Sequence, residues 1–270
     1  MAQTSPLMPA VFVGHGSPMT AFEQNPYVDA WRALGQRLPR PRSILVISAH
    51  WYTQGTAVTS SARQKTIHDF YGFPPELYEF RYDAPGSPEL AARTAALLAP
   101  VPVVGTDRWG LDHGAWTVLM HAYPKADIPV IQLSVDGTQP PQFHLELGRR
   151  LAPLREEGVL VMGTGNIVHN LRLYDRTGRS PPDPRAERFR KEIQARIKAH
   201  DHQGLANFMD IGPEAQLAQP TPDHFLPLLY IAGLQRDDED PEFITDVTEG
   251  VGVDMTTVLL GAGAMAEVAA

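Results

Sequence analysis

The stretch Ser43–Trp51 reads SILVISAHW, and the predicted fold follows from it. Its Ile, Leu and Val residues follow one another without a polar residue, up to Ser48. Such a run is typical of a strand that is buried on both faces, as in a parallel α/β sheet. The imidazole of His50 comes at the end of this strand and needs a partner there, because burying an unpaired polar group is unfavourable. We therefore predict a core strand that delivers a histidine to the edge of a sheet.

Similar apolar runs occur along the chain, and each stops at a turn-forming or polar residue. The predicted strands are Ala10–Val13, Ser43–Ile47, Val101–Val104, Val130–Val135 and Val159–Met162. Helical patterns lie between them, at Pro26–Leu38, Pro88–Leu98, Ala115–Ala122, Pro141–Arg155 and Arg185–His200. This alternation predicts an α/β fold with a single doubly wound, mostly parallel sheet flanked by helices. The pattern of Val253–Leu260 fits either a last strand or a helix.

The composition excludes several classes of protein. No cysteine occurs among the 270 residues, so disulfides, thiolate nucleophiles and cysteine-ligated metals are excluded. A formal net charge of −8, with dispersed Lys and Arg, argues against a nucleic-acid partner. No apolar stretch approaches the roughly 18 residues of a membrane span, and Met1–Ala10 lacks the features of a signal peptide. We expect a single domain over residues 1–270, located in the cytoplasm, with no nucleic-acid or membrane partner.

Five histidines stand where a ligand site is expected. His15, His50, His113 and His169 fall at or beyond the ends of predicted strands, and His224 precedes an apolar helix. Ligands of open α/β sheets bind beyond the carboxyl ends of the strands, so these imidazoles can meet in one crevice. A single histidine in such a place is more often a hydrogen-bonded structural residue. The prediction of a ligand site therefore depends on several histidines occurring at such places together. Of the other five histidines, we interpret His121, His144, His200 and His202 as surface or capping residues.

Other catalytic motifs are absent or weak. The glycine-rich turn Gly163–Asn166 lacks the spacing of a dinucleotide or triphosphate loop, and no His-Glu-x-x-His helix occurs. Ser17 lacks the Gly-x-Ser-x-Gly elbow of serine hydrolases. Asp112 either caps a helix or orients the neighbouring imidazole, and the cap is favoured.

Six motifs in order resemble one enzyme family. They are Gly14–Pro18 (GHGSP), Ser48–Trp51 (SAHW), Ile67–Pro74 (IHDFYGFP), Asp112–Gly114 (DHG), Gly165–Asn170 (GNIVHN) and Pro222–Leu228 (PDHFLPL). Together they resemble the class III extradiol ring-cleavage dioxygenases, most closely those of the DOPA 4,5-dioxygenase type. The resemblance extends from Pro9 to about Gly261. Any one of the motifs is weak, but six in the same order form a specific signal.

The resemblance implies a non-haem Fe(II) enzyme whose partners are a small catechol and dioxygen. Such an enzyme inserts both oxygen atoms beside the diol and yields a muconic semialdehyde. By family position, His15, His50 and His224 are the metal ligands, His169 is the acid–base residue, and His113 is a second polar contact to substrate or oxygen. Three neutral ligands leave the centre with a charge of +2, as in catalytic zinc sites, so zinc is an alternative occupant.

Several aromatic and polar residues are expected to form the substrate-binding walls. The run His68, Asp69, Phe70 and Tyr71 is the favoured substrate-facing loop, because a polar pair inside an aromatic run is unusual in a connector. Trp51 and Phe225 are further wall residues, although each also fits a plain core position. Two alternatives to the dioxygenase remain at this point: a zinc hydrolase that uses the same ligands to activate water, and a non-enzymatic metal-binding protein.

Overall fold

The strands form one mixed sheet in the computed structural model, which describes residues 7–175, 177, 180–249 and 251–262. Within these residues, eight strands pair in the order β4-β3-β5-β2-β6-β1-β10-β7. Their bounds are β1 Ala10–Gly14, β2 Ser43–Thr53, β3 Thr56–Thr59, β4 Val103–Thr106, β5 Val130–Asp136, β6 Val159–Gly165, β7 Glu242–Thr245 and β10 Thr257–Leu260. The two short strands β8 (Thr248–Glu249) and β9 (Val253–Asp254) pair with each other outside this sheet.

The centre of the sheet is parallel, antiparallel pairs occur on either side of it, and the edge strand β4 is again parallel to β3. Strand β2 pairs in parallel with β5 and β6, and β6 pairs in parallel with β1. The antiparallel pairs are β3 with β5, β10 with β1, and β10 with β7. The predicted α/β sheet is therefore confirmed, and Val253–Leu260 proves to hold two strands, β9 and β10. Strand β3 escaped prediction because TAVT is short and half threonine.

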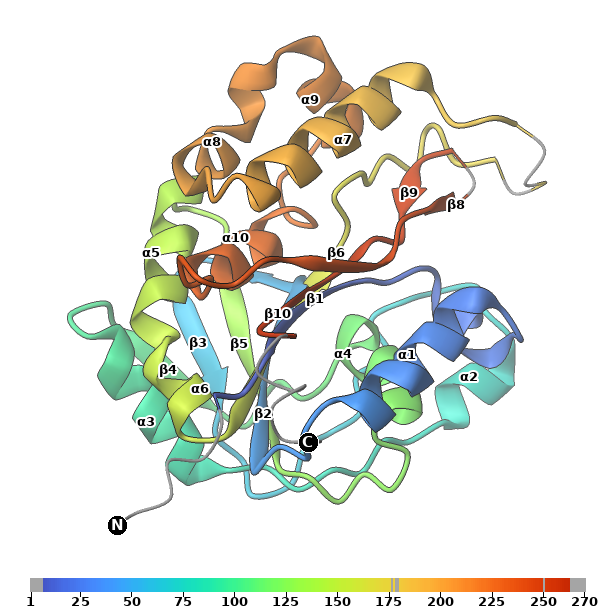
Figure 1. Cartoon of the computed structure of the whole chain (residues 1–270). Helices are drawn as coiled ribbons and strands as arrows, with labels where there is room; N and C mark the ends of the chain where they lie inside the picture. Colours follow the sequence, from blue (N-terminus) through green and yellow to red (C-terminus); the bar gives the residue numbers. More distant parts are fainter. Residues whose placement is uncertain (1–6, 176, 178–179, 250, 263–270) are drawn as a thin grey trace.

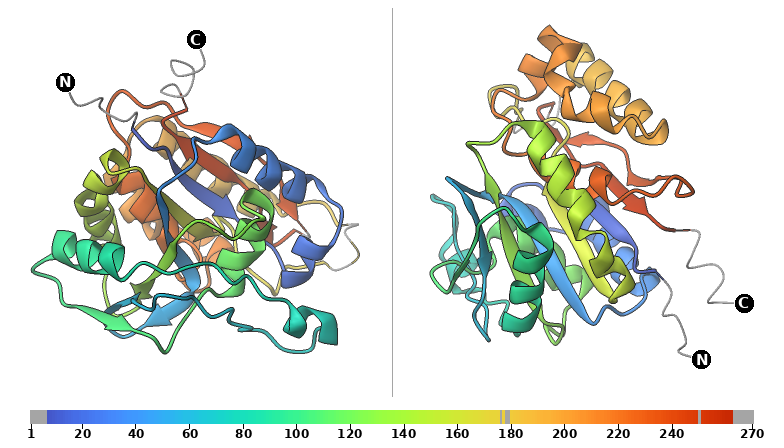
Figure 2. Two further views of the ribbon diagram at one scale, coloured as in Figure 1. Left: turned by 90° about the horizontal axis from the view of Figure 1, so that it is seen from below. Right: turned by 90° about the vertical axis from the view of Figure 1, so that its left-hand side faces the viewer.

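Helices cover both faces of the sheet, as Figure 1 and Figure 2 show. Helices α1 (Pro26–Arg37), α2 (Pro75–Glu79) and α4 (His113–Ala122) pack on one face. The other face carries α3 (Pro88–Leu98), α5 (Pro141–Leu151), α6 (Pro153–Glu156) and α10 (Leu226–Gly233). Helices α7 (Pro184–Lys198), α8 (His202–Ala206) and α9 (Pro213–Ala218) extend this second layer at the top of Figure 1. Two short 3-10 helices span Pro18–Phe22 and Phe208–Ile211.

Strand β2 explains why its sequence has no polar alternation. Leu45 and Ile47 belong to the core under α5 and α10, whereas Ile44 and Val46 belong to the core under α1 and α4. All four side chains are fully buried. Successive side chains in a strand point to opposite faces, so a strand with helices on both sides needs apolar residues at every position.

One expectation about this strand is wrong. His50 does not end β2, which continues to Thr53. Gly14 and Gly165 pair at the ends of β1 and β6, and Ser48 lies beside Thr164 of β6. His50 thus lies past the end of β6, whereas β5 continues beside β2 to Thr53, with a register shift between Ile47 and Tyr52. The imidazole still reaches the carboxyl edge of the parallel strands.

A second expectation that fails concerns His144, which we placed on the surface or at a helix cap. The side chain is fully buried, because α5 packs against α10 at this point, and its Nδ1 lies 3.1 Å from the hydroxyl of Tyr230. Among the other three, His121 meets the carbonyl of Ala21 and His202 meets Gln235. These histidines belong to the packing of the fold.

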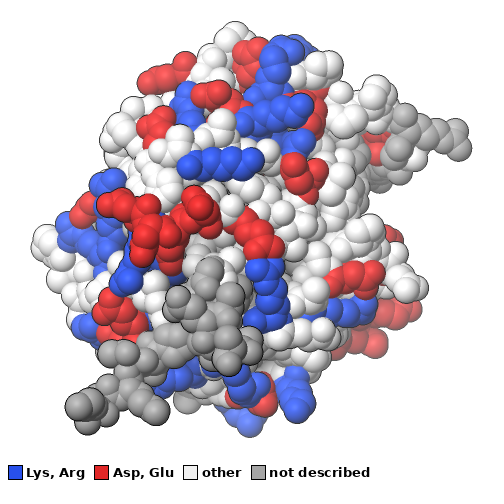
Figure 3. All heavy atoms as spheres, in the orientation of Figure 1, with Lys and Arg blue, Asp and Glu red and all other residues white. Residues whose placement is uncertain are grey.

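The surface gives two further observations. Acidic and basic side chains are intermixed on the face in Figure 3. Within the described part of the chain, every helix is too short or too polar to cross a bilayer. Most of Met1–Ala10, which we inspected for a signal peptide, lies outside the described residues, and the cytoplasmic location stays a prediction.

Candidate metal centre

Five histidines line one cavity at the carboxyl edge of the parallel strands. Nε2 of His15 lies 2.8 Å from Nε2 of His50. The ring centroid of His224 lies 5.6 Å from that of His15 and 5.0 Å from that of His50. The ring of His113 lies 3.9 Å from the ring of His50, and His169 stacks on His224 at 3.4 Å. These residues are far apart in sequence, and the structure brings all of them together.

Backbone contacts fix the position of His15 directly after β1. Its N–H donates to the carbonyl of Gly165. Its own carbonyl accepts a 2.8 Å hydrogen bond from Nδ2 of the buried Asn166, which also donates to the carbonyl of Asp254. One side-chain amide therefore joins the ends of three chain segments, a role that the sequence did not reveal.

The glycine-rich turn after β6 permits the close approach of His224. The N–H of Asn166 donates to the carbonyl of His224 at 2.9 Å. A Cβ added at Gly165 would lie 2.2 Å from that same carbonyl oxygen, and one at Gly163 would lie 2.8 Å from the carbonyl oxygen of Pro227. Gly163 and Gly165 thus leave room for the segment that carries His224. This packing explains why the turn is rich in glycine although it lacks the spacing of a phosphate-binding loop.

This contact leads to a prediction for Gly165→Ala. The methyl group must push the His224 backbone away, so we expect a loss of roughly 1–3 kcal/mol in the free energy of unfolding and weaker metal binding. Urea unfolding and metal titration measure the two effects. Gly105→Ala is the matched control, because its Cβ would meet only the Ser60 side chain, at 3.2 Å. Equal metal affinity in the two variants would contradict the proposed role of the glycine.

Carboxylates orient three of the imidazoles. Asp69 Oδ2 lies 2.8 Å from His113 Nδ1 and 3.3 Å from His50 Nδ1, and Asp223 Oδ2 contacts His224 Nδ1. Burial raises the pKa of Asp69, but hydrogen bonds from His113 outweigh it and leave that pKa below its usual value. A carboxylate at Nδ1 fixes the proton there and turns Nε2 outward as a free donor atom. The arrangement is that of metal-binding histidines.

The electrostatic environment keeps two of the imidazoles in their metal-binding form. Burial, followed by repulsion from His113, lowers the pKa of both His15 and His50 well below the usual value. These imidazoles are therefore neutral at pH 7, the form in which histidine binds a metal. The residues fit a metal ion. The Nε2 atoms of His15 and His50 face each other at 2.8 Å, and a metal ion between them would use the lone pairs of both neutral rings. Among the described residues, one group with ligand atoms within 4.8 Å contains His15, His50 and His113, and another contains His169, Asp223 and His224.

His169 and His113 enter the cavity from other elements. His169 follows β6, and its N–H donates to the carbonyl of Ala218 at 2.8 Å. Burial, followed by the nearby His224, lowers the pKa of His169 to about 3, which leaves the ring neutral. His113 begins α4, and Asp112 accepts a hydrogen bond from the N–H of Ala115. Asp112 is therefore a helix cap, as favoured from the sequence.

The cavity has a volume of about 710 Å³, which is in the range of small-molecule sites. Besides the histidines it is lined by Gly16, Ser17, Pro18, Tyr71, Gly72, Phe73, Asn166, Leu171, Tyr174 and Val253. Apolar and aromatic groups thus surround a polar histidine cluster. Such a site can hold a planar ring against a metal ion.

Comparison with known proteins identifies the family. The model of the catalytic LigB subunit of aromatic ring-opening dioxygenases matches residues 9–261. The chain belongs to this family. It is thus an extradiol dioxygenase, an oxidoreductase that incorporates dioxygen, and LigB dioxygenases depend on a metal.

Relatives of this LigB-family chain occur in bacteria and plants. It is 46% identical to the 4,5-DOPA dioxygenase extradiol of Escherichia coli K12 over 95% of this chain and 94% of the relative. It is 38% identical to the protein of the same name from Beta vulgaris, over 88% and 91% of the two chains. The crystal structure of an uncharacterized protein from Escherichia coli K12 matches with a TM-score of 0.84 and 42% identity. That match covers 94% of this chain and all of the other.

Not all of the loop residues that were expected to bind substrate, His68, Asp69, Phe70 and Tyr71, line the cavity of this LigB-family enzyme. Tyr71 lines the cavity and is 92% exposed, and the buried Phe70 packs on His113 at 5.8 Å. The carboxylate of Asp69 contacts the rings of His113 and His50. His68 does not line the cavity, because its ring meets the carbonyl of Phe80 at 3.1 Å and packs on Trp116.

Trp51 and Phe225 do not lie in the site, so this expectation is wrong for both. Trp51 follows His50 in the same strand and points to the other face, where it stacks on Trp109 at 5.7 Å. Phe225 is fully buried and stacks on Phe208 at 4.0 Å. Residues next to a cavity histidine in sequence thus pack elsewhere here, whereas Leu171, Tyr174 and Val253 line the cavity without a signal in the sequence.

Proposed function

We propose that this protein cleaves the ring of a DOPA-like catechol beside its diol, with dioxygen, to give a muconic semialdehyde. The observation that carries the proposal is the cavity in which the proposed metal ligands His15, His50 and His224 meet two further histidines, His113 and His169. A binding protein needs only the first group, whereas a ring-cleaving enzyme needs both. The names of the relatives, 4,5-DOPA dioxygenase extradiol, support the substrate class.

His15, His50 and His224 would hold the metal. His50 and His224 have carboxylate partners at Nδ1, and His15 is held through its backbone. When bound, Fe(II) supplies the Lewis acidity that lets a catechol bind deprotonated, and the electrons that activate dioxygen. Three protein ligands on one side leave coordination positions for the substrate.

The two remaining histidines would handle protons and orientation. His169 is neutral at pH 7, so a ring nitrogen can accept the proton of the second catechol hydroxyl and later return it to oxygen. His113 has its Nδ1 engaged with Asp69, which leaves Nε2 as a polar contact for substrate or oxygen. The apolar wall around Phe73 and Leu171 would keep water from the reacting groups.

An oxygen-uptake assay tests the proposal. After anaerobic loading with Fe(II), the protein should consume dioxygen with DOPA and give a yellow ring-opened product. It should not do so with tyrosine, because two adjacent oxygens close a chelate ring on the metal and one cannot. Equal uptake with both compounds would contradict the extradiol reaction. Zn(II)-loaded protein is the control. Hydrolysis of an ester without oxygen uptake would favour the zinc hydrolase, the alternative suggested by a ligand set of three histidines.

A further inference from the structure

Asp69 makes an unusual set of contacts at the edge of the metal centre. Its Oδ2 lies 2.8 Å from Nδ1 of His113 and 3.3 Å from Nδ1 of His50. Its Oδ1 accepts a 2.9 Å hydrogen bond from the backbone N–H of His113. One carboxylate thus meets three groups on two elements, the strand β2 and the first residue of α4. This residue was expected to bind substrate, but its acceptor atoms face the protein.

These contacts determine how both imidazoles are turned. An ionised carboxylate only accepts hydrogen bonds, so His113 donates to it from Nδ1, and the Nδ1 edge of the His50 ring also faces it at 3.3 Å. The Nε2 atoms of both rings therefore point away from the carboxylate. Nε2 of His50 lies 2.8 Å from Nε2 of His15, within the predicted ligand set. The centroid of the His113 ring lies only 3.9 Å from that of His50. A movement of Asp69 therefore displaces a metal ligand and its neighbour together.

The surroundings of Asp69 hold it in this position. Its side chain is 13% exposed, and the next residue, Phe70, packs its ring on His113 at 5.8 Å. Asp223 is the natural comparison for Asp69. Among the described residues it contacts the ring of His224 and neither His50 nor His113. The two carboxylates differ in the number of imidazoles that they orient.

We propose that Asp69 is a positioning residue that couples the metal ligand His50 to the substrate-facing His113. Through one carboxylate the protein sets both the metal affinity and the direction of the second polar contact in the cavity. Asp223 sets the metal affinity alone. The part of this inference that concerns turnover rests on the proposed ring cleavage, whereas the part that concerns metal binding and proton positions does not.

The experiment compares Asp69→Asn with Asp223→Asn, and uses Asp83→Asn, an exposed residue near the same loop, as the control. Asparagine keeps the shape of aspartate but offers one acceptor atom, so it cannot serve the imidazoles and the His113 N–H together. Chelator competition measures the metal affinity. Asp69→Asn and Asp223→Asn should both bind Zn(II) about 10–100-fold more weakly, as is usual for the loss of a ligand's partner.

Turnover at saturating Fe(II) separates the two roles. Asp223→Asn should gain turnover as Fe(II) is added, because its defect lies in metal affinity, whereas the exposed control Asp83→Asn should keep the wild-type kcat. Asp69→Asn should keep a kcat at least about tenfold lower at a little-changed KM, because His113 stays misplaced. Nitrogen-15 NMR of the imidazoles in metal-free protein should show a changed proton position at His50 and His113 in Asp69→Asn alone. If Asp69→Asn does not fold, Asp69→Glu gives the same comparison, because it moves the carboxylate by one methylene.

Two results would overturn the proposal: a wild-type metal affinity in Asp69→Asn, or a kcat that excess metal restores fully. Unchanged imidazole spectra would do the same. If even the wild-type protein fails to cleave a catechol, the proposed function fails. Weaker metal binding and altered His50 and His113 spectra in Asp69→Asn would then still support the positioning role.

Discussion

Replacing His224 with Ala should remove the metal from the purified protein and lower turnover on a catechol by about 10³-fold or more. The ring of His224 lies 5.0 Å from that of His50 and is oriented by Asp223. A catalytic metal contributes several kcal/mol to the rate, and about 4 kcal/mol corresponds to a factor of 10³. Metal analysis by mass spectrometry, with turnover measured on the same sample, checks the prediction.

The comparison variant is His113→Ala, because His113 stands as close to His15 and His50 in the structure. If His15, His50 and His224 are the ligands, His113→Ala should keep its metal and lose only activity. Full metal content in His224→Ala, together with metal loss in His113→Ala, would assign the third ligand to His113 instead. Unfolding curves of both variants should stay close to the wild type, since the site lies at a cavity.

The second large effect is expected for His169→Gln. Glutamine keeps a polar side chain of similar size but cannot accept and return a proton near neutral pH. Turnover should therefore fall by roughly 10²–10⁴, the usual contribution of a positioned acid–base group. Metal content should remain near the wild-type level, because His169 is proposed as an acid–base residue and not as a ligand. Steady-state kinetics on metal-loaded protein give the measurement.

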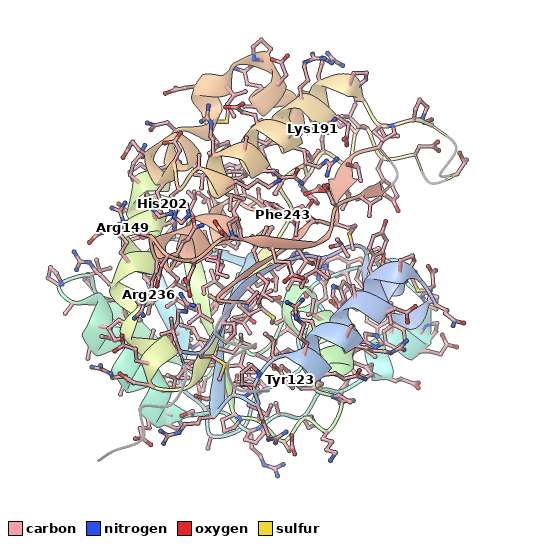
Figure 4. The ribbon with its side chains drawn as sticks, viewed as in Figure 1. Tyr123, Arg149, Lys191, His202, Arg236 and Phe243 are labelled. Atoms are coloured by element: carbon pink, nitrogen blue, oxygen red, sulfur yellow. The ribbon has the colours of Figure 1, made fainter. Side chains whose placement is uncertain are left out.

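The control for this variant is His202→Gln. His202, which Figure 4 labels, lies on α8, contacts Gln235 and does not line the cavity. It should have the wild-type rate. Metal loss in His169→Gln as large as that in His224→Ala would make His169 a fourth ligand, contrary to the proposed role. The stacking of the two rings at 3.4 Å makes this comparison necessary.

Much of the fold was predictable, because burial on both faces leaves a simple mark in the sequence. The run Ile44–Ile47 has apolar residues for both cores, and the helices between strands begin at recognisable caps and prolines. Thr56–Thr59 shows the limit: a short edge strand packs few side chains, so its sequence carries little pattern. His144 was misassigned because helical position alone does not reveal which face another helix covers.

The site was predictable as a set of histidines and less so in its supporting residues. Strand ends and motif order pointed to the five imidazoles. The pairing of Asp69 with His113 joins residues 44 positions apart, and only the folded loop brings them together. The error at Trp51 was avoidable, since neighbours in a strand point to opposite faces. Phe225 carried no such warning, because it lies in a turn.

Labelling with ¹⁸O₂ tests the central claim most directly. Fe(II)-loaded protein is mixed with a catechol under ¹⁸O₂ in ordinary water, the product is trapped with borohydride to prevent exchange at the aldehyde, and its mass is measured. The account predicts a ring-opened product that carries two ¹⁸O atoms, one at each new carbon terminus. A product whose new oxygen comes only from water, or the absence of a ring-opened product, would contradict it.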